Sequence, residues 1–299
     1  MLTINFLSFF YYLINFQIFT NNYYEIVNYL LIHDGPVPKH IKYCVNQIVK
    51  IDENSKVYLG INSNDHFENA EIINLDKAMS ERTKEIIKLN IFSTEDNRLW
   101  ITSLLRLFYL SDVANYLNID KFVHFDNDVL IFKKFDDIKE EFDYSKFNIT
   151  PLSENMLIFG YSFTPKLKIY DTILDKVYEY LINQDLENLV NLKSKELNEM
   201  KLLHLIYEEN KEEFNLLNVL PNSSKYLFDP ASYGQYLAGT KDKFTKKFID
   251  ENHVVGQAIK NEQFSLYFYK KYPELLFKNK KYELINLHIH SKKLNKYKT

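Results

Sequence analysis

The strongest constraint on the fold is a strand, helix, strand pattern near the start of the chain. The strand-like run IVNYLLIHDG (26–35) ends in a turn and is followed by VPKHIKYCVNQIVKI (37–51), where apolar residues recur at helical spacing. A polar turn at 52–55 leads into a second strand, KVYLGI. Two strands joined through a helix by short connections favour a right-handed crossover in a parallel sheet. The pattern predicts an α/β fold with a mostly parallel, Rossmann-like sheet flanked by helices.

Composition and missing motifs exclude several classes of function. The chain has 299 residues and a formal net charge of −3, so it lacks the broad positive field of nucleic-acid-binding proteins, and we expect no nucleic-acid partner. Its single cysteine, Cys44, excludes a disulfide framework and a multi-cysteine zinc site, and is expected to be a small buried hydrophobe. Residues 34–38 (DGPVP) cannot form the glycine-rich turn that binds NAD or FAD, and there is no Walker loop.

The N-terminal segment is aromatic and carries no charge over residues 2–20. It approaches the length of a membrane span, but polar residues interrupt it and no basic residue precedes it. It is therefore either a membrane anchor or an aromatic segment packed on the domain or a partner. We divide the chain into an N-terminal segment (1–25), one domain (26–293) and a basic tail (294–299), located in the cytoplasm or peripheral to a membrane.

The rest of the chain continues the α/β pattern. Residues 100–117 are apolar nearly all round and predict a buried helix that carries Arg106, and residues 121–125 predict a short strand after it. The remaining expectations are strands at 147–151 and 156–163, a helix at 167–182, charged helical sequence at 185–215, an ordered loop at 220–240, and a last strand near the C-terminus.

Two carboxylates, Asp126 and Asp128, follow the short strand at 121–125. On a regular strand this spacing places both side chains on one face, and carboxylates suit a hard cation such as Mg²⁺ or Mn²⁺. The same spacing at 141/143 and 185/187 lacks this context, and a solvated turn is the common fate of such pairs. Because ligands bind beyond the carboxyl ends of strands in open α/β sheets, the sequence predicts a metal site at Asp126 and Asp128.

The segment SLLRLFYLSDVANYLNIDKFVHFDNDVLIF (103–132) resembles the region around the DXD motif of nucleotide-sugar-dependent glycosyltransferases with a GT-A fold. Residues 37–61 are similar to the first strand–helix–strand unit of the capsule-type and giant-virus-type members, and FDPASYGQYLAGT and NLHIHSKKL to later blocks. The resemblance covers about 27–135 and 220–293, and 140–215 only loosely. It implies sugar transfer from a nucleotide-diphosphate donor to a glycan, lipid or protein acceptor.

The resemblance implies that Asp128 binds Mn²⁺ or Mg²⁺ directly, whereas Asp126 contacts the sugar or ribose and reaches the metal through water. Arg106 would hold a carboxylate or reach the donor, the alternative being an arginine that snorkels to the surface. A C-terminal histidine would complete the metal shell. His288 is preferred over His290 for this role. In the family the spacing between this histidine and its lysine is usually wider than in this sequence, which leaves the choice of histidine open. The alternative is that the H-x-H pair has a structural role, as such pairs often do.

Further residues are candidates for binding or catalysis. Lys292 or Lys293 would neutralise the leaving diphosphate. Three further candidates for the acceptor site or a catalytic base are Glu199, Asp229 and Gln235. The alternatives without a catalytic role are a solvated helix face for Glu199 and a turn at Asp229. Asp65 stands where the resemblance implies a contact to the nucleotide, or in a polar turn.

Two other functions fit the same residues. A nucleotidyltransferase that makes nucleotide sugars would share the sheet, the acids and the metal, but it normally carries a glycine-rich loop that residues 33–38 do not provide. A glycan-binding relative without catalysis would retain the fold with a decayed site. Intact Asp126, Asp128 and Arg106 argue against decay.

Overall fold

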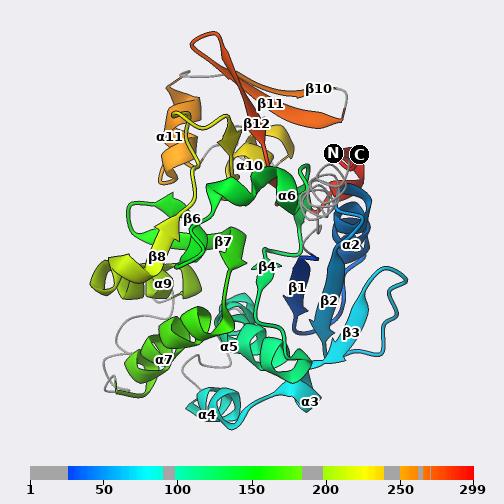
Figure 1. Ribbon diagram of the computed structural model, residues 1–299, viewed down its shortest axis with the longest axis vertical. Coiled ribbons are helices and arrows are strands. Elements are labelled where there is room, and N and C mark those ends of the chain that lie inside the picture. The colour runs from blue at the N-terminus through cyan, green and yellow to red at the C-terminus, as the bar shows by residue number, and fades with distance from the viewer. Residues whose placement is uncertain (1–25, 90–97, 184–197, 239–249, 262–264, 270) are drawn as a thin grey trace, which may run out of the picture.

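The computed structural model describes residues 26–89, 98–183, 198–238, 250–261, 265–269 and 271–299 (Figure 1). The N-terminal segment lies outside the described residues, so its association with a membrane stays a prediction. Among the residues described, no helix has the length and apolar character to cross a membrane.

A seven-stranded sheet with the order β3-β2-β1-β4-β7-β6-β8 forms the centre of the structure. Four of its strand pairs are parallel, and β7 is antiparallel to both of its neighbours. The strands are β1 (Asn28–His33), β2 (Lys56–Ile61), β3 (Glu71–Asn74), β4 (Phe122–His124), β6 (Phe147–Ser153), β7 (Met156–Thr164) and β8 (Phe214–Leu216). The expected mostly parallel α/β sheet flanked by helices is confirmed.

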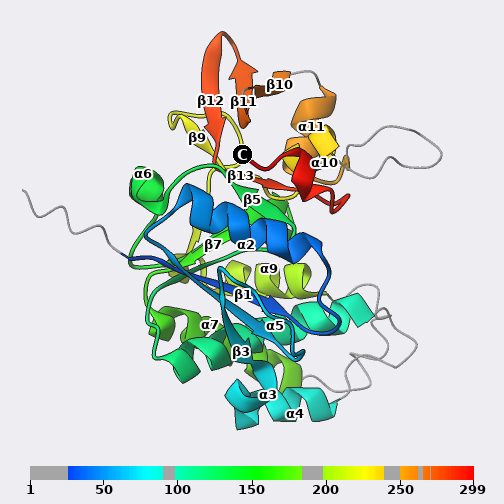
Figure 2. The same cartoon turned by 90° about the vertical axis from the view of Figure 1, so that its right-hand side faces the viewer.

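Helices cover both faces of this sheet because both faces are apolar. In β1 alternate residues enter two different cores: Tyr29 and Leu31 pack with α2, whereas Leu30 and Ile32 pack with α5. Figure 2 shows α2 and α5 on different sides of β1. A strand buried on both faces gives the continuous apolar run seen in the sequence. The helices are α2 (His40–Ile51), α3 (Leu75–Ala78), α4 (Glu81–Leu89), α5 (Arg98–Leu117), α6 (Phe135–Ile138), α7 (Leu167–Asn183), α9 (Glu199–Glu209), α10 (Tyr233–Ala238) and α11 (Val254–Lys260).

Two smaller sheets complete the structure above the large one (Figures 1 and 2). One is a two-stranded antiparallel ribbon of β5 (Val129–Ile131) and β13 (Asn286–His288). The other has the order β10-β11-β12-β9, with β9 (Tyr226–Leu227), β10 (Ser265–Tyr269), β11 (Tyr272–Phe277) and β12 (Lys280–Leu284). The ribbon joins segments far apart in sequence and so brings the C-terminal part of the chain next to Asp128.

Several sequence expectations need correction. Asp126 and Asp128 follow β4, as predicted, but they lie in the turn between β4 and β5, so the same-face spacing of a regular strand does not apply to them. The range 185–215 is helical only in part among its described residues, because α9 is followed by a 3₁₀ turn (Lys211–Glu213) and by β8. The expected loop at 220–240 contains β9 and α10. Cys44 is fully buried, as expected.

Candidate active site

Hydrogen bonds to three other segments hold the turn that carries Asp126 and Asp128. The Asp126 amide donates to the carbonyl of Phe159 at 2.9 Å, and the Asn127 side chain donates to the carbonyl of Ile32 at 2.7 Å, at the end of β1. The Asp128 carbonyl accepts from the Ile289 amide at 2.8 Å. The acid-containing turn is therefore fixed to β7, to β1 and to the C-terminal segment at once.

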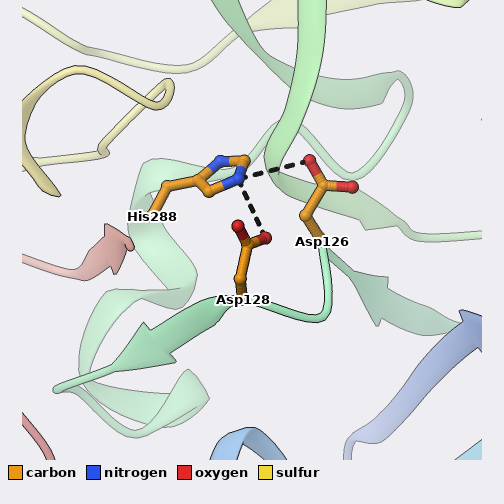
Figure 3. A group of neighbouring side chains, drawn as sticks. All are labelled: Asp126, Asp128 and His288. Carbon is orange, nitrogen blue, oxygen red and sulfur yellow. Dashed lines mark ion pairs between the residues drawn. The ribbon is translucent and has the colours of Figure 1, made fainter. Parts of the chain in front are cut away.

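Strand β13 brings His288 to the two acids (Figure 3). His288 pairs with Val129 in the ribbon, and its Nε2 lies 3.0 Å from Asp128 Oδ1 and 3.6 Å from Asp126 Oδ2. One ligand atom from each of the three residues lies within 4.8 Å of the others. The carboxylates and the imidazole therefore converge on one point, which is the geometry a bound cation needs.

Cations compensate the buried Asp128 carboxylate. Its second oxygen pairs with the Lys292 ammonium group. Burial alone would raise the pKa of Asp128, but His288 and Lys292 outweigh this and hold it well below its ordinary value. For the His288 imidazole the effect of burial has the opposite sign and by itself lowers the pKa. The Asp128 and Asp126 carboxylates outweigh this effect, so the pKa of His288 lies above its ordinary value. The His288 imidazole and the Lys292 ammonium group thus both face the Asp128 carboxylate.

Arg106 lies behind the acids and links two of them. Its guanidinium group pairs with Asp126 through one nitrogen and with Glu199 at 2.5 Å through the other, and it lies over the ring of Phe159. The side chain is 14% exposed, so the snorkelling alternative is wrong. Burial raises the pKa of Glu199 to about 7, and Arg106 opposes that rise. Glu199 is buried at the first position of α9, which excludes the solvated helix face.

Asp229 is enclosed by backbone. One carboxylate oxygen accepts the amides of Ser232 and Tyr233 at 2.7 and 2.9 Å, and the other accepts those of Gly234 and His288 at 2.7 and 2.8 Å. The residue is 0% exposed. Four donors occupy the carboxylate, so the geometry favours a positioning role for Asp229 over the catalytic or acceptor-binding role expected from the sequence.

Gln235 and His290 form a pair beside the acids. The Gln235 side-chain amide lies 2.9 Å from His290 Nδ1, and the rings of His288 and His290 have centroids 4.6 Å apart. Burial lowers the pKa of His290 to about 4, so this imidazole is neutral at physiological pH. His290 Nδ1 is engaged by Gln235, and His288 is the histidine whose nitrogen faces both acids.

A cavity of about 610 Å³ contains most of the residues expected from the sequence. Its lining includes Arg106, Asp126, Asp128, Glu199, Gln235, His288, His290 and Lys292. Asp65 and Asp229 are not among the described residues that line it. Asp65 instead accepts a hydrogen bond from the Ser63 hydroxyl at 2.6 Å in the exposed turn after β2. This position agrees with the alternative that Asp65 belongs to a polar turn.

Other residues that line the cavity are not among those predicted from the sequence. His33 and Asp34 stand at the carboxyl end of β1, and His40 begins α2. The strand-end rule that selected Asp126 would also have selected Asp34, which was interpreted only as part of a turn. Trp100 and His253 reach the cavity from segments with no local signal for a site.

The donor set fits a divalent cation. Two carboxylates and one imidazole provide hard oxygen ligands and a borderline nitrogen, which suit Mn²⁺ and, for the oxygens alone, Mg²⁺. The Nδ1 atom of His288 is buried without a hydrogen-bond partner among the described residues. Ring orientation therefore depends on the backbone of β13, which Asp229 holds, and not on a carboxylate behind the ring.

Replacing Arg106 by lysine keeps the charge but removes the planar fork that holds Asp126 and Glu199 together. We expect a fall of about 10- to 100-fold in turnover, the effect of losing one hydrogen bond to a charged group, and a lower melting temperature, because the buried Glu199 loses a partner. Steady-state kinetics and thermal melting would measure the two effects. Unchanged kinetics in a folded variant would show that the fork has no part in the reaction.

No protein-family model matches the chain, and no curated protein matches it. Mouse xyloside xylosyltransferase 1 is similar in structure at 12% identity over 64% of this chain and 86% of its own, with a TM-score of 0.37. GlyE, a glycosyltransferase of Streptococcus pneumoniae, has 12% identity over 64% of this chain and 45% of its own, with a TM-score of 0.37. The galactosyltransferase LgtC, in complex with donor and acceptor sugar analogs, has 12% identity over 74% of this chain and 82% of its own, with a TM-score of 0.40. Similarity at these TM-scores carries no argument about function, which must come from the site.

Proposed function

We propose that the chain is a metal-dependent glycosyltransferase that uses a nucleotide-diphosphate sugar as donor. The observation that carries the proposal is the convergence of Asp126, Asp128 and His288 within 4.8 Å, in a cavity that also contains Lys292. Two segments resemble the DXD region and the C-terminal block of GT-A glycosyltransferases, and the ribbon of β5 and β13 joins these two segments side by side. Residues 26–293 are proposed to act as one domain.

Asp128 and His288 would hold the cation directly, with Asp126 as a ligand or as a partner of a metal-bound water. When bound, Mn²⁺ or Mg²⁺ supplies Lewis-acid stabilisation of the departing diphosphate. His288 would hold the cation as a neutral imidazole, since only a neutral imidazole can be a ligand. Lys292, which pairs with Asp128, would balance part of the negative charge of the diphosphate.

The remaining chemistry is transfer of the sugar. The bond between the anomeric carbon and the diphosphate oxygen breaks, and its electron pair leaves with the diphosphate. An acceptor hydroxyl oxygen forms the new bond to the anomeric carbon and releases its proton to a base or to solvent. The role of Arg106 is to hold Asp126 and Glu199 in fixed positions at the wall of the cavity, so that donor and acceptor meet in one orientation.

A panel of nucleotide sugars incubated with the purified chain and Mn²⁺ tests the proposal. We expect one donor to release nucleoside diphosphate slowly by hydrolysis, and faster when an acceptor glycan is added, with loss of release in EDTA. A parallel incubation with a sugar 1-phosphate and a nucleoside triphosphate identifies the reaction class, because a nucleotidyltransferase would join these two into a nucleotide sugar and release pyrophosphate. Absence of any release, with or without acceptors, would contradict glycosyl transfer.

A further inference from the structure

A second groove of about 650 Å³ lies apart from the candidate active site. It is bordered by the end of α2, by the residues that follow β5 and by the sheet of β10, β11 and β12. His40 at the start of α2 lines the active-site cavity, and Ile51 at its end lines this groove. At about 1.5 Å per residue, the two positions are about 16 Å apart along the helix. The groove is therefore a separate feature.

Exposed tyrosines gather on the hairpin of β10 and β11 that borders the groove. Tyr267, Tyr269 and Tyr272 are 51%, 60% and 46% exposed. In the antiparallel register Tyr269 lies opposite Tyr272, and Tyr267 is two residues from Tyr269, so the three rings share one face of the hairpin. Tyr269 and Tyr272 line the groove together with Phe132. The rings of Phe132 and Tyr272 pack edge-on, with their centroids 6.5 Å apart. Large aromatic surface is thus held on a strand pair and left open to solvent.

Charged groups of both signs stand beside these rings. Lys133 and Lys134 line the groove with Asp137, Glu274 and Glu283. Several of them are tied in pairs: Glu283 pairs with Lys133, and Lys134 pairs with Glu53 at 3.3 Å. Glu274 likewise pairs with Lys281 at 3.3 Å. The lining thus offers ammonium donors and carboxylate acceptors with little net charge, which does not favour a strongly charged ligand.

We propose that this groove is a binding site for a neutral oligosaccharide. A pyranose ring has an apolar face of C–H groups that packs on an aromatic ring, and hydroxyls at its edge that bind carboxylates and ammonium groups. Tyr269 and Tyr272 supply the aromatic surface, and Glu274, Lys134 and Asp137 supply partners for hydroxyls. If the chain transfers sugars as proposed above, a glycan held here would keep the enzyme attached to a polymeric acceptor. The inference is independent of the metal chemistry, because no candidate metal ligand lines the groove.

Titration of the full chain with linear hexaoses tests the site. The probes are maltohexaose, cellohexaose, xylohexaose, mannohexaose and chitohexaose, followed by saturation-transfer NMR in EDTA. We expect at least one to bind, and Tyr272→Ala and Tyr269→Ala each to weaken it by about fivefold or more, as for the loss of an aromatic anchor. The matched control is Tyr116→Ala on α5, which is 57% exposed and lines neither cavity, and it should leave binding unchanged.

Two further measurements separate this groove from the active site. Asp128→Asn should bind the hexaose like the parent, and Tyr269→Ala should keep the Mn²⁺-dependent release of nucleotide. The proposal is overturned if no hexaose binds at millimolar concentration, if Asp128→Asn abolishes binding, or if both folded tyrosine variants bind like the parent. Failure of glycosyl transfer with binding retained would count against the proposed function alone.

Discussion

Replacing Asp128 by asparagine is expected to weaken Mn²⁺ and nucleoside-diphosphate binding together and to lower glycosyl transfer by at least about 10²- to 10³-fold, the scale seen when stabilisation of a developing charge is lost. The variant keeps the size of the side chain but removes the charge that faces both His288 and Lys292. Isothermal titration calorimetry with Mn²⁺ and the diphosphate would measure binding, and a nucleotide-release assay would measure transfer.

Glu141→Gln is the matched control for this variant. Glu141 has the same acid-x-acid spacing with Asp143, but its carboxylate accepts only from the Ser224 hydroxyl, at 2.9 Å, among the contacts described, and an amide oxygen can accept that bond equally well. We expect parent-like metal binding and activity. If Asp128→Asn bound Mn²⁺ and nucleotide as well as the parent does, the acidic turn would be a solvated turn and the proposed reaction would lose its chemical basis.

A methyl group at position 234 is expected to destabilise the fold strongly, because α10 lies directly on the backbone of β13 there. A Cβ at Gly234 would lie 2.1, 2.6 and 2.8 Å from the O, C and N atoms of His288. Backbone atoms cannot turn aside as a side chain can, so Gly234→Ala must separate helix from strand. We expect a loss of about 3 kcal/mol or more in the free energy of unfolding, measured by urea denaturation, together with weaker Mn²⁺ binding.

Gly60→Ala provides the comparison within the same chain. A Cβ at Gly60 would meet Leu75 Cδ2 at 2.7 Å and Ile32 Cδ1 at 2.8 Å, which are the ends of side chains that can shift. This variant should lose less stability and keep its metal affinity, since none of the atoms that the added Cβ would meet belongs to Asp126, Asp128 or His288. Equal urea midpoints for Gly234→Ala and the parent would show that α10 does not rest on β13 as described.

The sequence predicted those features whose cause is local. The apolar run of β1 reflects burial on both faces of the strand, and the helical spacing in α2 reflects burial of one face of the helix, so the parallel sheet could be inferred from short windows. Asp126 and Asp128 could be found because the acids and their strand are neighbours in the chain. Strand β8 has only three residues, and its pairing with β6 is what makes it a strand, so its own composition could not reveal it.

The parts of the site that were missed depend on contacts between distant segments. The bond between Arg106 and Glu199 spans 93 residues, and helical periodicity says nothing of which acid an arginine will meet. Asp229 is a candidate for acceptor binding or a catalytic base from the sequence because it lies in the FDPASYGQY block that resembles the glycosyltransferases. Three of its four backbone donors lie within the same turn at 229–234, but the fourth, the His288 amide, is 59 residues away and is reached only when the turn packs against β13.

The ribbon of β5 and β13 has a consequence for the order in which the protein is made. Every strand of the seven-stranded sheet precedes residue 217, whereas His288 and Lys292 belong to β13 and the residues just after it. Because the ribosome releases the chain from its N-terminus, the large sheet can form before either cation has emerged. Until then Asp128 has neither its cations nor the strand that covers it, and its carboxylate stays hydrated. The last-made strand both buries and neutralises the acid, so an incomplete chain carries the sheet without a working centre.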